Sequence, residues 1–526
     1  MKKIFIGLLF MCGLAACTSN FVNENQNPYE ISDVLLQQDF NLVGSPFSGM
    51  LYQLHGDQGS QIEEDLCYDS WMGYMNTGTD FVANVNNTTY AMAWRGAYWN
   101  REYGSIMSPA KQVIALAKTN NLPLFATWAN LIRILSMSRV TAIHGPIIYS
   151  NYGSTANSIP YDKESDLYNL FFAQLDTIQT AFAANTSYAG FVKFDPSYGG
   201  KIASWMKLVN SVRLQLAMRI SKVAPAVAKT QGEKAMADPA GLIATNTDNF
   251  LLSQLGKIMP VGMICFQWDD TRMGGVIESF MVGMNDGRIS KYFSAVSDPA
   301  LYADHPAFPY KGIRNGSYIT SKAAHINFSK VSTDFNTVQN RRHLTAAEVS
   351  FLKAEAALRG WVGAGDAKTN YENGVRLSFA DWGGANVDAY LVDKTSKPIA
   401  YVDPVDSRNN FTPLSTITVA WNEGDSNELK LEKIMTQKWL NNFTNTLESW
   451  VDFRRTGYPK IPHVAKNDSP SRSYGIVAPD QWIKRMEFTD AERLSNAAAV
   501  ATATSSLGGA DEIGTRLWWD TGGSNF

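Results

Sequence analysis

The clearest fold signal in the chain lies in residues 344–382, LTAAEVSFLKAEAALRGWVGAGDAKTNYENGVRLSFADW. Thr345 and Glu348 have the spacing of a capping box, in which two side chains satisfy backbone N–H groups at a helix start. Apolar residues then recur at helical spacing, at Val349, Leu352, Ala356 and Ala357. The first half of these residues therefore predicts a helix that begins after Thr345.

Three glycines end this helix, and a second helix follows them. Gly360, Gly363 and Gly365 interrupt the periodicity, and glycine is the residue most often found where a helix stops. Asp366 can cap the next helix. The apolar side chains of that helix are spaced four residues apart, at Ala367, Tyr371, Val375 and Phe379. Two helices joined by a short glycine-rich turn form an αα-hairpin.

Three more stretches show the same pattern, near residues 104–140, 165–220 and 427–455. We expect Ser165 to cap a helix in the second of them and Pro123 to lie in the first turn of a helix in the first. Repeated helical hairpins are typical of tetratricopeptide-like scaffolds. The spacings give no regular period, so the repeat is predicted from helix pattern alone.

The hairpins are interrupted by two loop-rich insertions, about 223–343 and 382–425. Glycine, proline, aspartate and aromatic residues interleave there without lasting periodicity, as in Gln267-Trp268-Asp269-Asp270. We expect long loops with short strands, and loops of this length are usually functional. The fold class is thus mainly α: tetratricopeptide-like hairpins with loop-rich insertions and a few short strands, in a single domain spanning residues 34–526.

The N-terminus has the layout of an export signal. Lys2 and Lys3 precede an apolar run that is too short to cross a bilayer, and Leu14-Ala15-Ala16-Cys17 closes it. A cysteine at this position resembles the lipobox of bacterial lipoproteins, although an ordinary signal with a chance cysteine is the alternative. The expected organisation is a signal peptide over residues 1–16, lipid on Cys17 and a flexible tether over 17–33. No apolar run of eighteen residues follows Cys17.

Composition excludes several classes of protein. Charged residues make up 18% of the 526 residues and aromatic residues 12%, which suits a folded body and not a disordered chain. Without Lys2 and Lys3 the 46 basic residues become 44 against 49 acidic ones. No long basic run is present, which argues against nucleic acid as a partner. Cys67 and Cys265 are the cysteines left in the body, either as one disulfide or as two buried thiols.

Motifs of catalysis are missing from the sequence. None of the six histidines lies in an HExxH pattern, and there is no GxSxG elbow, phosphate-binding loop or zinc-type cysteine spacing. We therefore predict no catalytic residue, no metal and no cofactor. Two carboxylate clusters, 63–65 and 269–270, leave open a glycoside hydrolase. Such clusters more often mark solvated turns or helix starts.

Aromatic and amide residues are dense between residues 71 and 103. Flat rings stack on the apolar faces of sugars or on peptide side chains, and amides supply directional hydrogen bonds at the rim. Packing inside the helical body is the alternative for each of them. The twelve residues are Trp71, Tyr74, Phe81, Asn84, Asn86, Asn87, Tyr90, Trp94, Tyr98, Trp99, Asn100 and Tyr103.

In combination, these features resemble the SusD/RagB family of nutrient-binding outer-membrane lipoproteins of Bacteroidetes. The lipobox with Phe21, Asn25 and Asn27-Pro28 resembles the start of the family. Internal blocks agree over the whole mature chain. They are Trp94-Arg95 with Tyr98-Trp99-Asn100, the hairpin from Leu344 to Tyr371, Glu432-Lys433-Ile434 with Gln437-Lys438-Trp439, residues 448–457, and Lys484-Arg485-Met486 with 492–496.

The resemblance implies a surface protein of the outer membrane, lipid-anchored and facing the cell exterior. It implies a SusC-like TonB-dependent transporter as partner, over which the protein sits as a lid that captures oligosaccharide and breaks no bond. A peptide-binding protein on the same scaffold is the alternative. By position, the expected ligand contacts come from the aromatic N-terminal loops and the middle insertion. They are Trp71, Tyr74, Asn84, Trp268, Arg272 and Tyr292.

Overall fold

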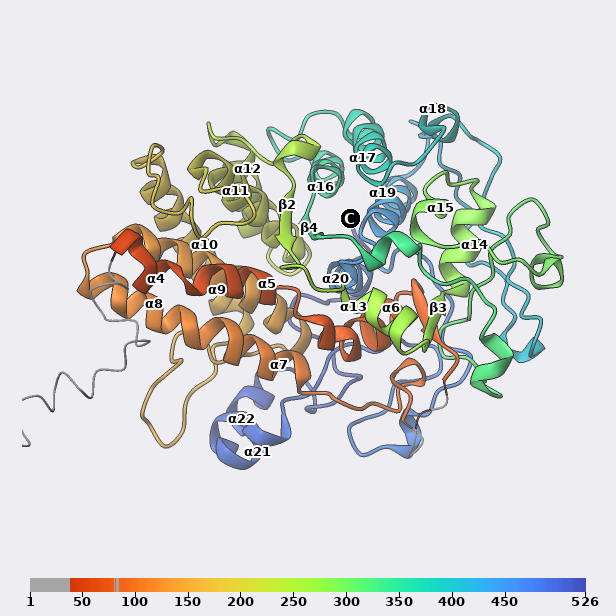
Figure 1. Ribbon diagram of the computed structural model, residues 1–526, viewed down its shortest axis with the longest axis horizontal. Helices are drawn as coiled ribbons and strands as arrows, with labels where there is room; N and C mark the ends of the chain where they lie inside the picture. Colours follow the sequence, from red (N-terminus) through yellow and green to blue (C-terminus); the bar gives the residue numbers. More distant parts are fainter. Residues whose placement is uncertain (1–37, 80, 82–84) are drawn as a thin grey trace, which may run out of the picture.

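A computed structural model describes residues 38–79, 81 and 85–526, and most of its regular structure is α-helical (Figure 1). The longer helices succeed one another along the chain, and most of them pack against the next one in sequence. They are α8 (Ser108–Thr119), α9 (Pro123–His144), α10 (Glu164–Ala183), α11 (Ile202–Arg219), α12 (Pro225–Ala237), α16 (Ala346–Leu358), α17 (Ala367–Trp382), α19 (Asn427–Asn441) and α20 (Thr446–Thr456).

In the described part of the chain, shorter helices and four strands lie between and around these longer helices. The short helices are α4 (Asn41–Gly44), α5 (Pro46–Gln53), α6 (Asp69–Trp71), α7 (Ala97–Glu102), α13 (Pro260–Gly262), α14 (Gly275–Gly283), α15 (Ile289–Tyr292), α18 (Val387–Leu391), α21 (Asp490–Ser495) and α22 (Ala497–Ser505). The strands are β1 (Met75–Thr77), β2 (Phe250–Ser253), β3 (Thr271–Met273) and β4 (Asn340–Leu344).

The four predicted hairpins are confirmed as α8–α9, α10–α11, α16–α17 and α19–α20. In the α16–α17 hairpin, the Thr345 side chain accepts from the Glu348 N–H at 3.2 Å, and Asp366 accepts from the Thr369 N–H at 2.8 Å. Gly360 adopts φ +69°, a left-handed conformation that glycine reaches without steric cost. Local sequence therefore determines the ends of both helices.

Two details of the predicted caps are wrong. Glu348 does not complete a capping box, because its carboxylate accepts from Gln215 Nε2 at 2.9 Å and lies 3.3 Å from Lys438 Nζ in the core. Ser165 is not a cap, because α10 already begins at Glu164 and its N-cap is Lys163, without a side-chain cap bond. Pro123 occupies the first turn of α9, as expected. For Glu348, contacts with residues distant in sequence therefore replace the expected local cap bond.

The insertion at 223–343 contains the expected short strands. It also contains helices that were not predicted from the sequence, including α12 and α14. Strand β1 pairs antiparallel with β3, with Asn76 opposite Arg272. Strand β2 pairs antiparallel with β4. The first pairing joins the N-terminal aromatic loops to the middle insertion.

A single apolar core runs through the described part of the chain. Its largest fully buried side chains include five tryptophans that come from helices far apart in sequence and from the C-terminus. They are Trp128, Trp205, Trp439, Trp450 and Trp519. Cys67 and Cys265 are both buried free thiols, so of the two alternatives the unpaired one holds.

Among residues 38–79, 81 and 85–526, no helix is both long and apolar enough to cross a bilayer. The predicted signal peptide, Cys17 and the tether lie outside the described residues.

Candidate functional site

A face built from loops gathers the two regions from which ligand contacts were expected. The β1–β3 pairing places the segment after Trp71 beside the segment after Trp268. Residues 317–326 join the same face, since Lys322 Nζ donates to the Trp268 carbonyl at 2.9 Å and pairs with Asp270 at 2.7 Å. We call this the loop face, and it lies around β3 in Figure 1.

Trp268 is the expected ligand residue that the loop face presents to solvent, and the residue is 49% exposed. The segment beneath it is fixed, because Asp270 Oδ1 accepts from the Thr79 hydroxyl at 2.7 Å and also pairs with Lys322. An exposed indole on an anchored segment offers a flat apolar surface with little conformational freedom to lose on binding. Asn84 lies outside the described residues.

Three of the expected contacts are core residues instead. Trp71, Tyr74 and Tyr292 are buried, and their polar atoms are used internally. Trp71 Nε1 donates to the Asn87 carbonyl at 3.0 Å, Tyr74 bonds Ser449 at 2.7 Å, and Tyr292 donates to the Leu440 carbonyl at 2.7 Å. These rings present no face to a ligand. Their spacing resembled a binding surface because core and ligand aromatics look alike in sequence.

Arg272 has a positioning role in this structure. Its side chain is buried, and its guanidinium donates to the Ile326 carbonyl at 2.8 Å and to Asp269 Oδ1 at 2.8 Å. It therefore ties the segment that carries Trp268 to the 317–326 loop. Such a group shapes the loop face from below and is not presented to a ligand.

Next to the 317–326 loop lies a polar hollow of about 460 Å³. Residues from distant parts of the sequence form its walls, namely Asn86, Ser317, Ile319, Lys466, Asp468, Ser471 and Arg472. The Thr89 hydroxyl donates to Asp468 at 2.7 Å, which fixes the C-terminal wall to the N-terminal loop. Beside it, the Arg408 guanidinium lies 4.1 Å from the Tyr318 ring centre. Sequence reasoning missed the 466–472 wall, and the turn-rich run Asn467-Asp468-Ser469-Pro470 is the signal that could have located it.

The first carboxylate cluster that left a hydrolase open, 269–270, is engaged in ion pairs. Asp269 lies 2.7 Å from Lys330 Nζ and 2.8 Å from Arg272. Partial burial raises the pKa of Asp269, but these two cations outweigh it and hold the pKa below its ordinary value. A general acid in glycoside hydrolysis needs a raised pKa. Asp269 is therefore unsuited to that role.

The second cluster, 63–65, is buried in the core. Glu63 pairs with Arg101, and Glu64 with Arg341. Asp65 has no cationic partner of its own among the described residues. Burial, with the neighbouring Asp69 and Glu64 carboxylates, raises the pKa of Asp65 well above its ordinary value. Because Asp65 is buried away from any substrate in solution, its protonation affects the stability of the fold and not catalysis.

Replacing Asp65 with asparagine should flatten the pH dependence of stability. The raised pKa means that the folded protein keeps a proton that the unfolded chain releases above about pH 4. Stability of the wild type therefore falls as pH rises from there, by about 1.4 kcal/mol per pH unit for each proton retained. Denaturant titrations at pH 5, 6, 7 and 8 measure this slope.

The introduced amide carries no titrating proton, so the slope of Asp65→Asn should be shallower and its stability at pH 8 equal to or above that of the wild type. Asp388→Asn, at an exposed carboxylate, is the matched control and should keep the wild-type slope. Identical slopes for Asp65→Asn and wild type would refute the assignment.

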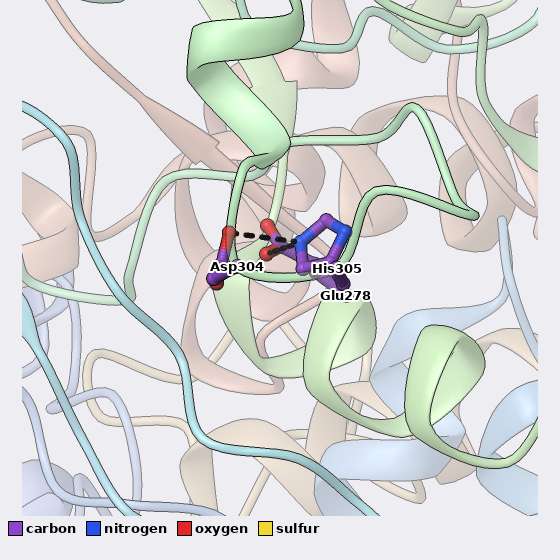
Figure 2. A group of neighbouring side chains, drawn as sticks. All are labelled: Glu278, Asp304 and His305. Atoms are coloured by element: carbon purple, nitrogen blue, oxygen red, sulfur yellow. Dashed lines mark hydrogen bonds and ion pairs between the residues drawn. The ribbon is translucent and has the colours of Figure 1, made fainter.

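One further cluster has the composition of a metal site. Glu278, Asp304 and His305 converge in Figure 2, with His305 Nε2 at 2.9 Å from Glu278 Oε1 and 3.6 Å from Asp304 Oδ1. The buried Lys311 ammonium, however, lies 2.9 Å from the same Glu278 oxygen. Partial burial lowers the pKa of His305, but the hydrogen bond and charge of Glu278 have the larger combined effect, so the pKa is raised. Two acids against two basic groups make this an ion-pair cluster, with Lys311 in the place of a metal cation.

Comparison with known proteins places most of the chain in one family. The model of the SusD-like family, described as Susd and RagB outer membrane lipoprotein, matches residues 23–520. No curated protein matches the chain.

Solved structures of similar proteins cover almost the whole chain. A chitin-binding SusD homologue from Flavobacterium johnsoniae is 37% identical, with a TM-score of 0.87, over 92% of this chain and 100% of its own. A SusD homologue from Bacteroides uniformis is 34% identical, with a TM-score of 0.84, over 91% and 99%. These structures confirm the predicted mainly α fold.

Proposed function

Because this chain belongs to the SusD-like family of outer membrane lipoproteins, we propose that it is a non-catalytic surface protein that captures oligosaccharide and delivers it to a TonB-dependent transporter. The ligand class we propose is chitin oligosaccharide. The observation that carries it is the 37% identity to a chitin-binding homologue whose full length is covered.

The loop face supports this proposal chemically. Trp268 offers a ring on which a sugar can stack, and the adjacent hollow offers amide, hydroxyl and charged groups for hydroxyls and acetamido groups. Sugar sites typically combine these two elements, because pyranose rings have apolar faces and polar edges. No step in capture breaks a bond. Binding and release are sufficient.

The delivery step rests on the lipobox and the family. Lipid on Cys17 would hold the body beside the membrane, and the residues up to 33 would give it reach. We propose that the body faces the cell exterior and covers a SusC-like transporter as a lid. Closure over the barrel would pass the ligand inward, which is gating and not catalysis.

Replacing Trp268 with alanine should weaken binding of a chitin hexasaccharide to the loop face about tenfold, because a stacked ring contributes about 0.5–1.5 kcal/mol beyond its buried area. Isothermal titration calorimetry on the purified soluble body measures the change. Leu414→Ala removes an equally exposed apolar side chain elsewhere and should leave the affinity unchanged.

Affinity of Trp268→Ala equal to that of the wild type would reject the site assignment. Binding of peptides in place of the hexasaccharide would favour the peptide-binding alternative. Release of reducing sugar by the purified protein, lost in Asp269→Asn, would instead support a hydrolase.

A further inference from the structure

A groove lies away from the loop face, where α21 lies beside α7 (Figure 1). It consists of two hollows of about 470 and 670 Å³ that meet at Asn100, which lines both. Helix α21 contributes to both walls, since Asp490 lines the first hollow and Glu492 the second. Each volume lies within the range of small-molecule sites. The groove shares no lining residue with the polar hollow of the loop face.

Aromatic rings line both hollows. Trp94 is 46% exposed in the first and has φ +54°, a left-handed conformation that is uncommon for a large residue. In the second, the partly exposed rings of Tyr103 and Tyr152 have centroids 5.6 Å apart, and Trp99 packs 4.8 Å from Tyr103. Strained backbone that holds an aromatic side chain in solvent points to a functional surface.

The charged groups in the walls are mostly engaged already. Arg95 pairs with Glu487 and lies 4.6 Å above the Tyr474 ring. Glu492 accepts from the Tyr161 hydroxyl at 2.8 Å. Lys111 keeps a long bond of 3.3 Å to the Gly153 carbonyl.

The amides are the groups left for a ligand. The side chains of Asn100 and Gln112 are exposed and have no hydrogen-bond partner among the described residues. Open rings, free amides and engaged charges suit an uncharged, hydroxyl-rich ligand better than an ionic one.

We propose that this groove is a second saccharide-binding site. Sugar rings stack on Trp94 and on Tyr103 with Tyr152, while Asn100 and Gln112 bond hydroxyl or acetamido groups. The choice of chitin oligosaccharide as ligand rests on the proposed function, but the site itself rests on its own residues. A polymer held at the loop face and at the groove dissociates more slowly than one held at either, because the second contact is intramolecular.

Hydrogen exchange and calorimetry with a chitin hexasaccharide test the proposal on the soluble body. We expect two binding events in the wild type, and ligand-dependent protection of residues 97–115 and 148–160. Gln112→Ala and Tyr152→Ala should each weaken one event about tenfold and reduce that protection, while the Trp268 event stays unchanged. Lys118→Ala, on the same helix but outside the groove, is the control and should behave as wild type.

The outcomes separate the two proposals. If the wild type shows a single binding event that Trp268→Ala weakens and Gln112→Ala does not change, the proposed groove site is wrong and the loop-face site is supported. A single event with the opposite response would uphold the groove and reject the loop face. No heat and no protection at millimolar hexasaccharide would overturn both.

Discussion

Cells that carry Cys17→Ala are expected to stop growing on the captured glycan as sole carbon source, while the purified variant binds the hexasaccharide as tightly as the wild type. The lipid is the proposed link between the body and its transporter, and a tether raises the local concentration of the body beside that partner. Without it, captured ligand diffuses away with the protein. Growth curves and calorimetry on the same variant separate anchorage from recognition.

Thr18→Ala keeps the cysteine and is the matched control, with growth expected at the wild-type rate. Membrane fractionation should place this control with the membrane and Cys17→Ala with the soluble proteins. Normal growth of Cys17→Ala would show that the tether is dispensable and that its proposed purpose is wrong.

Glu355→Ala is expected to destabilise the fold by about 3 kcal/mol, at the lower end of the cost of breaking a buried pair, because it removes the two-pronged counter-charge of Arg455. Asp452, 3.2 Å from the same guanidinium, still pairs with it. Glu355 on α16 and Arg455 on α20 form a two-pronged pair at 2.6 and 2.7 Å, both fully buried, and Arg359 adds a bond at 2.8 Å. Burial raises the pKa of Glu355, but the two arginines have the larger combined effect and lower the pKa to about 2. The midpoint of denaturant unfolding at pH 7 measures the loss.

The sign of the pH effect is fixed by the lowered pKa. The pair stabilises fully above the ordinary value of 4.5 and is lost as pH falls towards 2. Wild type and Glu355→Ala should therefore converge in stability towards pH 2. The double variant Glu355→Leu/Arg455→Met should recover much of the loss at pH 7, since apolar replacements of a buried pair are often tolerated. Arg376→Ala, at an exposed pair, is the control and should leave the midpoint nearly unchanged.

The hairpins were predictable because their signals are local. Asp366 bonds a backbone N–H three residues away, and Gly360 needs only its own conformational freedom. Helix α12 escaped prediction because its sequence, PAVAKTQGEKAMA, has a narrow apolar face and buries few side chains. The Glu348 side chain was misplaced because its partner, Lys438, lies on α19, far along the chain.

The candidate site was predictable only in part. Of the expected contacts, Trp268 is exposed and Arg272 lies beneath it, whereas Trp71, Tyr74 and Tyr292 are in the core. Nothing in the local sequence of Tyr74 reveals that Trp439 and Ser449 lie beside it. Exposure is a property of the packed chain, so an aromatic-rich segment on its own does not distinguish a stacking platform from a core residue.

The amino-acid order was enough to predict the helical hairpins and the family, because these depend on residues close together or on patterns spread along the whole chain. It did not reveal which rings face solvent, that Lys330 holds Asp269, or that Asn86 and Asp468 share a hollow; these emerge from the folded molecule. The physical reason is that burial and charge pairing are set by neighbours that are often distant in sequence, and these meet only when the single core closes.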